Sequence, residues 1–196
     1  MQSRDVSEVL RPWQNWGPSP LSYDPLPEVF PSCGQCGLST WVELGGGEAP
    51  GVFHPNVDIR LLSGVDIVHD FRTGTLPFHG EHADRLRMLH VINHLSLVNA
   101  RKVLRECLRV LRSDGRFTIM VTDLAFVLER LLSDDLHESW MRCVFGTAGD
   151  TYDEDFHYWG YSAESLSEEL RQAGFINIQH RGYYNRWEFV LTAIRP

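Results

Sequence analysis

The chain has 196 residues, 43% of them hydrophobic and 22% charged, and its formal net charge is −8. This length suits one domain with a sizeable core. The acidic balance argues against nucleic acid as a partner, because binding to phosphates draws on clustered cations. No apolar run approaches the roughly 18 residues that a membrane helix needs, and the N-terminus lacks the apolar region of a secretory signal. We therefore expect a cytoplasmic protein without a membrane partner.

The N-terminal segment differs in composition from the rest of the chain. Six of the ten prolines fall within residues 1–38, interleaved with aromatic residues that include Trp13 and Trp16. Proline at this density excludes a long helix or a central strand, whereas the aromatic residues favour packing on a surface. We expect residues 1–38 to form an arm draped over a domain made by residues 39–196, with the arm covering a ligand cleft.

Two of the four cysteines, Cys33 and Cys36, form a Cys-x-x-Cys motif in this arm. A structural zinc site needs four ligands, usually two such pairs, and the sequence has no second cysteine pair. A redox motif would open a helix after a strand, whereas Gly34 and Gly37 place this one in an irregular segment. Reduced thiols without a metal are the expectation.

From Thr40 onward the sequence alternates between strand-like and helix-like segments, which is typical of a parallel sheet. The predicted elements of this half are, in chain order, strands at 40–44, 56–59, 65–70 and 83–92, an amphipathic helix at 97–112 and a buried strand at 116–121. We expect the helix to end in a turn at 113–115, where Gly115 suits a left-handed conformation.

The second half of the chain begins with a helix that Asp123 can cap. A further helix is expected between Ser162, as its cap, and Gly174 at its end. Two apolar segments, 175–180 and 187–194, close the chain and are predicted to pair antiparallel at the edge of the sheet.

The most informative motif is Trp-Val-Glu-Leu-Gly-Gly-Gly-Glu at 41–48, a strand followed by Gly45, Gly46 and Gly47. Glycine allows a sharp turn there and a close approach by a ligand. A dinucleotide site would need a third spaced glycine, where this chain has Pro50, and a helix facing the pyrophosphate. A ligand without phosphates, such as S-adenosylmethionine (SAM), fits better. A strand-to-loop turn without any ligand is the alternative.

Acidic residues lie at or near the ends of three consecutive predicted strands: Glu43, Asp58 and Asp70. In doubly wound sheets ligands bind beyond the C-terminal strand ends. Asp58 could accept the hydroxyls of a ribose, and Asp70 a hydrogen bond from an adenine amino group. The ordered series is more specific than any one of its members.

Several segments occur in the order typical of class I methyltransferases of the type 11 group: ELGGGE, NVDIR, VDIVHD, LPF, HVINHL, VLRECLRVLRSDGRFTIMVTDL and SLSEELRQAGF. The chain resembles a compact branch of this group from residue 40 to about residue 190. The resemblance implies an α/β fold with a Rossmann-like, doubly wound, mostly parallel sheet and an antiparallel C-terminal edge. Only 58 − 47 = 11 positions separate Gly47 from Asp58, so the first crossover helix is expected to be short or missing.

The resemblance also implies a SAM site. The residues that it assigns to the cofactor are Glu43, Gly45, Gly46, Gly47, Asp58 and Asp70, with Leu89 and His90 beside the methyl group that is transferred. The chain departs from the pattern at Asn93, where relatives often carry glutamate, and in the arm at 1–38. Both departures bear on the identity of the methyl acceptor.

Methyl transfer needs a base only if the acceptor must lose a proton, and histidine, with an ordinary pKa near 6.5, suits that role. His157 is the first candidate and His90 the second. No metal is expected, because His90-Val-Ile-Asn-His94 lacks the glutamate of the zinc motif that it superficially matches. Aromatic residues at 140–161 could either sandwich a flat acceptor or form a small core.

The sequence thus predicts an enzyme that transfers a methyl group from SAM to an oxygen or nitrogen of a small metabolite, natural product or sugar. The alternative is a non-catalytic, methyltransferase-like partner or scaffold subunit. Whether the chain forms a homodimer or binds a partner subunit is left open.

Overall fold

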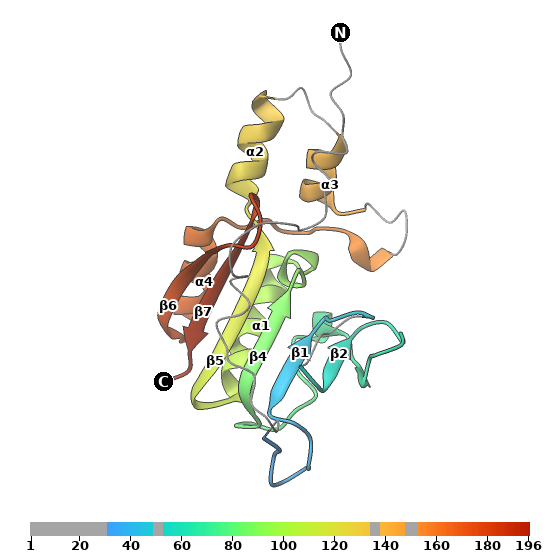
Figure 1. Cartoon of the computed structure of the whole chain (residues 1–196), viewed down its shortest axis with the longest axis vertical. Helices are drawn as coiled ribbons and strands as arrows, with labels where there is room; N and C mark the ends of the chain where they lie inside the picture. The colour runs from blue at the N-terminus through green and yellow to red at the C-terminus, as the bar shows by residue number, and fades with distance from the viewer. Residues whose placement is uncertain (1–30, 49–52, 134–137, 148–152) are drawn as a thin grey trace.

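The computed structural model describes residues 31–48, 53–133, 138–147 and 153–196, which form one seven-stranded sheet flanked by helices (Figure 1). The strand order is β3-β2-β1-β4-β5-β7-β6. The strands are β1 (Trp41–Leu44), β2 (Asn56–Asp58), β3 (Ile67–Val68), β4 (Ala83–Leu89), β5 (Leu111–Thr122), β6 (Ile176–Tyr183) and β7 (Glu188–Ile194). β1 to β5 pair parallel, whereas β7 runs antiparallel to both β5 and β6. The predicted Rossmann-like sheet with an antiparallel C-terminal edge is confirmed.

The strand order reverses between β1 and β4, which lie side by side although β2 and β3 come between them in the chain. At such a reversal the loops after the two neighbouring strands diverge, which opens a crevice at their C-terminal ends. The loop after Leu44 and the loop after Leu89 flank this crevice. The topology therefore fixes where a ligand can bind.

Two α-helices, α1 (Leu97–Val110) and α4 (Ala163–Ala173), contact each other and pack on the C-terminal half of the sheet (Figure 1). α1 contacts β5, and α4 contacts β6 and β7. The buried positions of α1 recur every three or four residues, as an amphipathic helix requires: Ala100, Val103, Leu104, Cys107 and Val110. Two shorter helices, α2 (Leu124–Ser133) and α3 (Glu138–Phe145), pair with each other beyond the C-terminal end of β5.

The N-terminal half of the sheet is built differently. Between β1 and β4, the part of the chain that the structure describes holds a single 3₁₀ turn, η3 (Phe71–Thr73), and no α-helix. The first crossover helix was expected to be short or missing. Residues 45–48 and 53–55, on either side of 49–52, contain no helix. In the described residues, less helix therefore covers this half of the sheet than the half covered by α1 and α4.

The predicted caps of the later helices are confirmed. The Ser162 hydroxyl accepts a hydrogen bond from the Ser165 amide (3.2 Å), and the Ser165 hydroxyl in turn accepts one from the Ser162 amide (2.9 Å). Gly174 ends α4 with φ 107°, a conformation that favours glycine. At α2, the Asp123 carboxylate accepts a hydrogen bond from the Ala125 amide (3.1 Å). Side-chain chemistry therefore fixes these helix ends.

The turn predicted at 113–115 is wrong in detail. These residues belong to β5, where the pairing with β4 jumps from Ala83–Leu111 to Arg85–Arg116. Asp114, and not Gly115, adopts the left-handed conformation, with φ 61°. Glycine is needed at 115 for space, because a Cβ there would lie 2.7 Å from the Arg112 carbonyl oxygen.

The main core lies between the sheet and helices α1 and α4, and a smaller cluster forms where α2 meets α3. Val127, Leu131 and Trp140 make up the smaller cluster, and Trp187 packs against it. In the described ranges no helix is long and apolar enough to cross a membrane. Most of the N-terminal arm, residues 1–30, lies outside those ranges, so its predicted place over the cleft stays untested.

Candidate cofactor and acceptor clefts

A cleft of about 660 Å³, including its open mouth, lies beyond the C-terminal ends of β1 to β4. Four residues predicted from the sequence line it together: Gly45, Asp58, Asp70 and His90. Its other polar lining residues are Arg60, Arg72, His94, Glu154, Asp155 and Tyr158. The fold thus gathers residues spread over a hundred positions of sequence at the reversal of the strand order.

Asp58 ends β2 and is almost fully buried, with 4% of its surface exposed. One carboxylate oxygen accepts a hydrogen bond from the Gly47 amide (3.1 Å). The other oxygen accepts hydrogen bonds from the Arg60 amide (3.0 Å) and the Arg60 Nε (3.3 Å). These contacts fix the orientation of the carboxylate. The oxygen that accepts from Gly47 has a further lone pair with which it can accept a ligand hydroxyl.

Asp70 follows β3 and repeats this arrangement, because Arg72 lies two residues later as Arg60 does after Asp58. The Arg72 guanidinium donates to both Asp70 oxygens, at 2.9 and 3.0 Å, and the Arg72 amide donates at 2.8 Å. The hydrogen bonds from the Arg72 side chain hold the pKa of Asp70 below its usual value. Asp70 therefore offers a charged acceptor at the second strand end.

The glycine loop connects β1 to these acidic residues. Gly45 has φ 76°, and a Cβ there would lie 2.1 Å from the Val91 side chain that follows β4. Gly46 donates its amide to the Asn56 side chain at 3.0 Å, and Gly47 donates to Asp58. Gly45 lines the cleft, whereas Gly46 and Gly47 hold the loop against β2. Direct contact of Gly46 and Gly47 with a cofactor stays a prediction.

Glu43 lies on β1, two residues before the glycine loop, with 1% of its surface exposed. It does not line the cleft. Its Oε2 pairs with the Arg87 Nε on β4. Burial raises the pKa of Glu43 to about 8 against the opposing effect of Arg87. The Oε1 atom has no hydrogen-bond partner among the described residues. A buried acceptor without a partner costs stability unless a ligand or water satisfies it.

The donor set of this cleft fits SAM. Two carboxylates stand at consecutive strand ends, where ribose hydroxyls and an adenine amino group would meet them. Among the described residues on either side of 49–52, no helix begins after the Gly45–Gly47 loop, whereas a pyrophosphate site would place a helix N-terminus there.

A second cleft adjoins the first, and Tyr158 lines both. Its walls include the aromatic residues Phe145, Phe156, Tyr158 and Trp159. The two other aromatic residues of this segment that the structure describes, Trp140 and Tyr161, are buried in the two cores. Part of the aromatic segment therefore belongs to the core, whereas stacking of its cleft-lining part on an acceptor stays a prediction.

His157 lines the second cleft. Its Nδ1 lies 3.1 Å from the Cys143 carbonyl oxygen, so Nδ1 carries the proton and Nε2 is left as the acceptor. Burial, followed by the nearby His94, lowers the pKa of His157 to about 4. The ordinary value near 6.5 expected from the sequence is therefore wrong for this residue. The ring is neutral at physiological pH and can accept a proton.

His90 lies at the cofactor cleft and not at the second cleft. Its backbone is left-handed, with φ 56°, and its Nε2 is 3.4 Å from a Glu188 carboxylate oxygen. Burial, His94 and His157 together lower the pKa of His90 to about 4, and burial raises the pKa of Glu188 to about 7. Leu89, the last residue of β4, lines neither cleft.

Sequence reasoning did not assign a role to Asn93, which also lines the second cleft. Asn93 is buried, and its Oδ1 has no hydrogen-bond partner among the described residues. Its carbonyl oxygen accepts hydrogen bonds from the Tyr158 amide at 2.8 Å and the Trp159 amide at 3.3 Å. These bonds join η4 (Ile92–His94) to the aromatic segment. The sequence signal that could have pointed to a role for Asn93 was that relatives often carry glutamate at this position.

Sequence reasoning also missed His79 and His82, which lie beside Cys33 and Cys36 before the N-terminal ends of β1 and β4. Zinc was not expected at Cys33 and Cys36 because the sequence has no second cysteine pair. Two histidines, His79 and His82, stand in the place of that pair. The His-x-x-His spacing at 79–82 was the signal that could have revealed them.

Residues 56–119, from β2 into β5, match the family model of the methyltransferase domain. A SAM-dependent methyltransferase from Thermotoga maritima, described as a possible histamine N-methyltransferase, is 17% identical, with a TM-score of 0.58 over 79% of this chain and 81% of that one. Human N-acetylserotonin methyltransferase in complex with SAM is 14% identical, with a TM-score of 0.53 over 79% and 46%. A chain of a Haloferax volcanii complex that contains the Trm112 methyltransferase activator is 15% identical, with a TM-score of 0.51 over 79% and 81%.

The comparison with curated proteins gives no match. At these identities the solved structures bear on the fold, and the matched segment adds the strand ends that carry Asp58 and Asp70. In its fold and over residues 56–119, the chain is therefore similar to class I methyltransferases, enzymes whose cofactor is S-adenosylmethionine.

Proposed function

We propose that the chain methylates an oxygen or nitrogen of a small metabolite, natural product or sugar that binds in the second cleft. The observation that carries this proposal is that His157 and Asn93, whose Oδ1 has no partner among the described residues, line the same cleft, which adjoins the cofactor cleft at Tyr158. The acidic net charge of −8 supports a small acceptor over a nucleic acid.

The polar groups of the second cleft suit an acceptor that carries a hydrogen-bond donor. The Asn93 Oδ1 can accept from a hydroxyl or an amine, and the Nε2 of His157 can accept the proton that this group loses. The aromatic side chains around them offer flat apolar surface to the remainder of the acceptor. A hydroxyl or amine on a flat small molecule satisfies all three features.

When bound, the cofactor supplies a methyl group on a sulfonium, so the acceptor needs a lone pair aligned with it. Asn93 would orient the acceptor, and His157 would take its proton as the new bond forms. Gly45, Asp58 and Asp70, which line the first cleft, would hold the cofactor there. His90 is the second candidate for the base, because it lines the cofactor cleft.

The proposal is tested with SAM whose methyl group carries an isotopic label. The purified chain is incubated with panels of small phenols, aromatic amines and sugars, and products are identified by mass. We expect a labelled product whose formation falls on the order of 10²-fold in His157→Gln. His180→Gln, an exposed histidine on β6, is the matched control and should retain full turnover.

Cofactor binding without any labelled product would overturn the enzyme proposal and favour the non-catalytic partner. A partner subunit is therefore included in a second set of reactions, since one solved chain with this fold belongs to a complex with an activator. Full turnover in both His157→Gln and His90→Gln would show that neither of these histidines is required as the base. The cytoplasmic location stays a prediction.

A further inference from the structure

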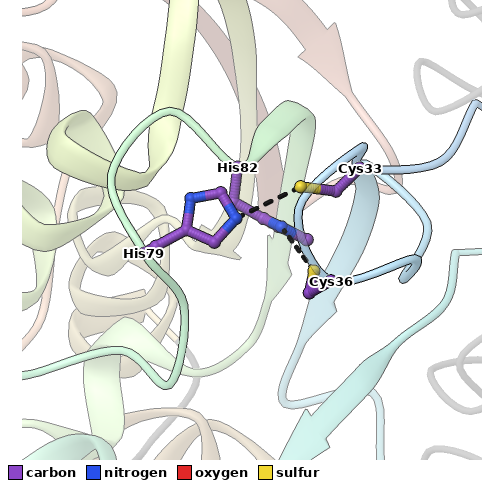
Figure 2. Close-up of side chains that lie close together, drawn as sticks. All are labelled: Cys33, Cys36, His79 and His82. Atoms are coloured by element: carbon purple, nitrogen blue, oxygen red, sulfur yellow. Dashed lines mark hydrogen bonds between the residues drawn. The ribbon is translucent and has the colours of Figure 1, made fainter.

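Four potential metal ligands lie together before the N-terminal ends of β1 and β4, whereas the two clefts lie at the C-terminal ends of the strands. They are Cys33, Cys36, His79 and His82 (Figure 2). Their ligand atoms all lie within 4.8 Å of one another. The Cys33 Sγ is 3.1 Å from His79 Nε2, and the Cys36 Sγ is 3.6 Å from His82 Nδ1. The cysteines precede β1 and the histidines precede β4, so the cluster joins two segments that are far apart in the sequence.

The cysteines sit in a tight turn whose backbone is arranged around Cys33. The Cys33 amide donates to the Leu38 carbonyl (2.7 Å), and the Gly37 amide donates to the Cys33 carbonyl (2.8 Å). This turn places both cysteine side chains beside the histidines.

Each histidine is held in the orientation that a metal ligand needs. The His82 Nε2 lies 3.1 Å from the Ser39 carbonyl oxygen, which leaves Nδ1 facing Cys36. The His79 Nδ1 lies 2.7 Å from the Gly80 carbonyl oxygen, which leaves Nε2 facing Cys33. Metal-binding histidines regularly donate their second ring N–H to a carbonyl or carboxylate, which fixes the tautomer. Both histidines here follow that pattern.

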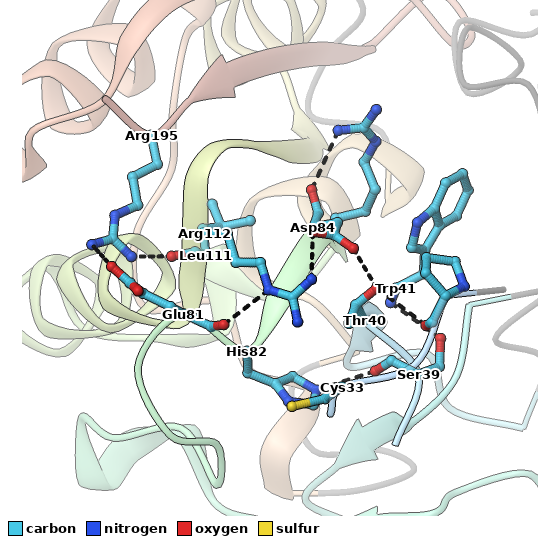
Figure 3. A network of polar contacts seen from close by, with 12 residues as sticks. Cys33, Ser39, Thr40, Trp41, Glu81, His82, Asp84, Leu111, Arg112 and Arg195 are labelled. Carbon is cyan, nitrogen blue, oxygen red and sulfur yellow. Dashed lines mark hydrogen bonds and ion pairs between the residues drawn. The ribbon is translucent and has the colours of Figure 1, made fainter. Parts of the chain in front are cut away.

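The surrounding carboxylates are engaged elsewhere and do not compete as ligands (Figure 3). Asp84 accepts hydrogen bonds from Thr40 at 2.6 Å and from Arg112 at 3.0 Å. Glu81 pairs with Arg195 at 3.1 Å. The ligand set that remains is two sulfurs and two nitrogens, which favours zinc among the common metals.

We propose that Cys33, Cys36, His79 and His82 bind one structural zinc ion. With bond lengths of about 2.3 Å to sulfur and 2.0–2.1 Å to nitrogen, a tetrahedral site needs ligand atoms about 3.3–3.8 Å apart. The observed separations lie on both sides of this range, from 3.1 Å to no more than 4.8 Å, so small shifts of the side chains suffice. The four protein ligands leave no open position for chemistry, and the ion would fasten residues 31–40 to the start of β4, in the half of the sheet that lacks α-helices in the described part of the chain.

Metal content and cobalt substitution test this site directly. The full chain, purified without chelator, should contain one zinc ion per chain by elemental analysis. After replacement by Co²⁺, the protein should show the strong visible bands of a tetrahedral ion and a thiolate-to-cobalt charge-transfer band. Removal of the ion should lower the Tm by roughly 5 °C or more, because binding to the folded chain alone stabilises it.

Variants separate this site from the other thiols and imidazoles. Cys36→Ser and His79→Gln alter ligands that are exposed or partly exposed, and each should lose most of the zinc. Cys143→Ser and His180→Gln are the matched controls and should retain it. Because the cobalt spectrum is recorded on the unaltered chain, a variant that fails to fold does not decide the outcome.

Two results would overturn the proposal. One is a reduced chain that takes up no stoichiometric Zn²⁺ or shows only the weak spectrum of octahedral Co²⁺. The other is a Cys33–Cys36 disulfide in the protein as isolated, with no metal uptake after reduction, which would assign the pair to redox chemistry. Neither readout depends on methyl transfer, so this inference stands or falls apart from the proposed function.

Discussion

At the scale of single residues, the two clefts are built from side chains whose protonation is set by their neighbours. Asp70 is held as a carboxylate by Arg72, whereas burial keeps His157 neutral. A charged acceptor suits the ribose and adenine groups of a cofactor, and an imidazole must be neutral before it can accept a proton. Both groups are thus held in their deprotonated forms.

Replacing Asp58 tests the cofactor assignment. Asp58→Asn keeps the shape of the side chain but removes the charge that strengthens its hydrogen bonds to a ribose. We expect the affinity for SAM, measured by calorimetry, to fall about tenfold or more, since a hydrogen bond to a charged group contributes roughly 1.5–3 kcal/mol. Glu129→Gln, on the exposed surface of α2, should leave the affinity unchanged. Equal affinity in the two variants would remove Asp58 from the site.

The pH profile of turnover tests the base. His157 must be neutral to accept a proton, and its pKa is about 4. The rate limited by chemistry should therefore stay level as the pH falls through 6.5 and decline only as it approaches 4. An inflection near 6.5 that disappears in His157→Gln would mean that burial does not shift this histidine. A profile identical in the unaltered chain and in His157→Gln would assign the base elsewhere.

At the scale of elements, the helices that support the clefts depend on a few capping and packing residues. The segment before α4 carries His157 and the aromatic walls of the second cleft, and α4 begins directly after it. The Ser162 cap therefore fixes the end of the segment that carries the proposed base.

Removing this cap should destabilise the protein without altering either cleft directly. Ser162→Ala loses the hydrogen bonds to Ser165, and the free energy of unfolding should fall by about 1 kcal/mol. Ser167→Ala, five residues further along α4, removes only a bond to the Ala163 carbonyl and is the matched control. Chemical denaturation measures both. If Ser167→Ala costs as much as Ser162→Ala, the cap is not what stabilises this helix.

Gly115 provides a second test at this scale. A Cβ at 115 would press on the Arg112 carbonyl oxygen at 2.7 Å, and backbone atoms there cannot yield as a flexible side chain would. We expect Gly115→Ala to lower the free energy of unfolding by about 1–3 kcal/mol. Gly80→Ala, whose Cβ would make only ordinary contacts from 3.5 Å, should be nearly neutral in the same denaturation experiment. A neutral Gly115→Ala would show that the β5 irregularity can relax.

At the scale of the whole molecule, the shifted pKa values couple folding to pH with opposing signs. The pKa of His157 is about 4 in the folded chain, so between about pH 6.5 and 4 the unfolded chain binds a proton that the folded chain does not. This lowers stability as the pH falls. The pKa of Glu188 is raised to about 7, so the folded chain holds a proton there that the unfolded chain releases, which lowers stability as the pH rises.

Because the two effects overlap, a variant is needed to isolate the histidine. Stability is measured by denaturation at pH 7.5 and pH 5 for the unaltered chain and for His157→Gln. The unaltered chain should lose more stability over this interval than His157→Gln, while His180→Gln corrects for the exchange itself. An equal loss in the unaltered chain and in His157→Gln would contradict the shift of this histidine.

The sequence by itself determined the order of the seven strands and the residues that cap α2 and α4. The alternation of apolar segments predicted the strands from β1 to β7, and short-range hydrogen-bonding residues such as Asp123 and Ser162 predicted helix starts. Asp58 and Asp70 could be found because a strand end is itself a local feature. Such features depend on neighbours within a few residues, so a linear reading captures them.

Only the tertiary structure decided which distant side chains meet. His157 and Asn93 share one cleft and His90 lines the other, although both histidines were predicted as candidates for the same base. Cys33 and Cys36 acquire His79 and His82 as neighbours because β1 and β4 pair side by side across the reversal of the strand order. The pKa of about 4 at His157 likewise arises from burial by segments far along the chain. Pairing, burial and charge depend on three-dimensional proximity, which local sequence patterns do not encode.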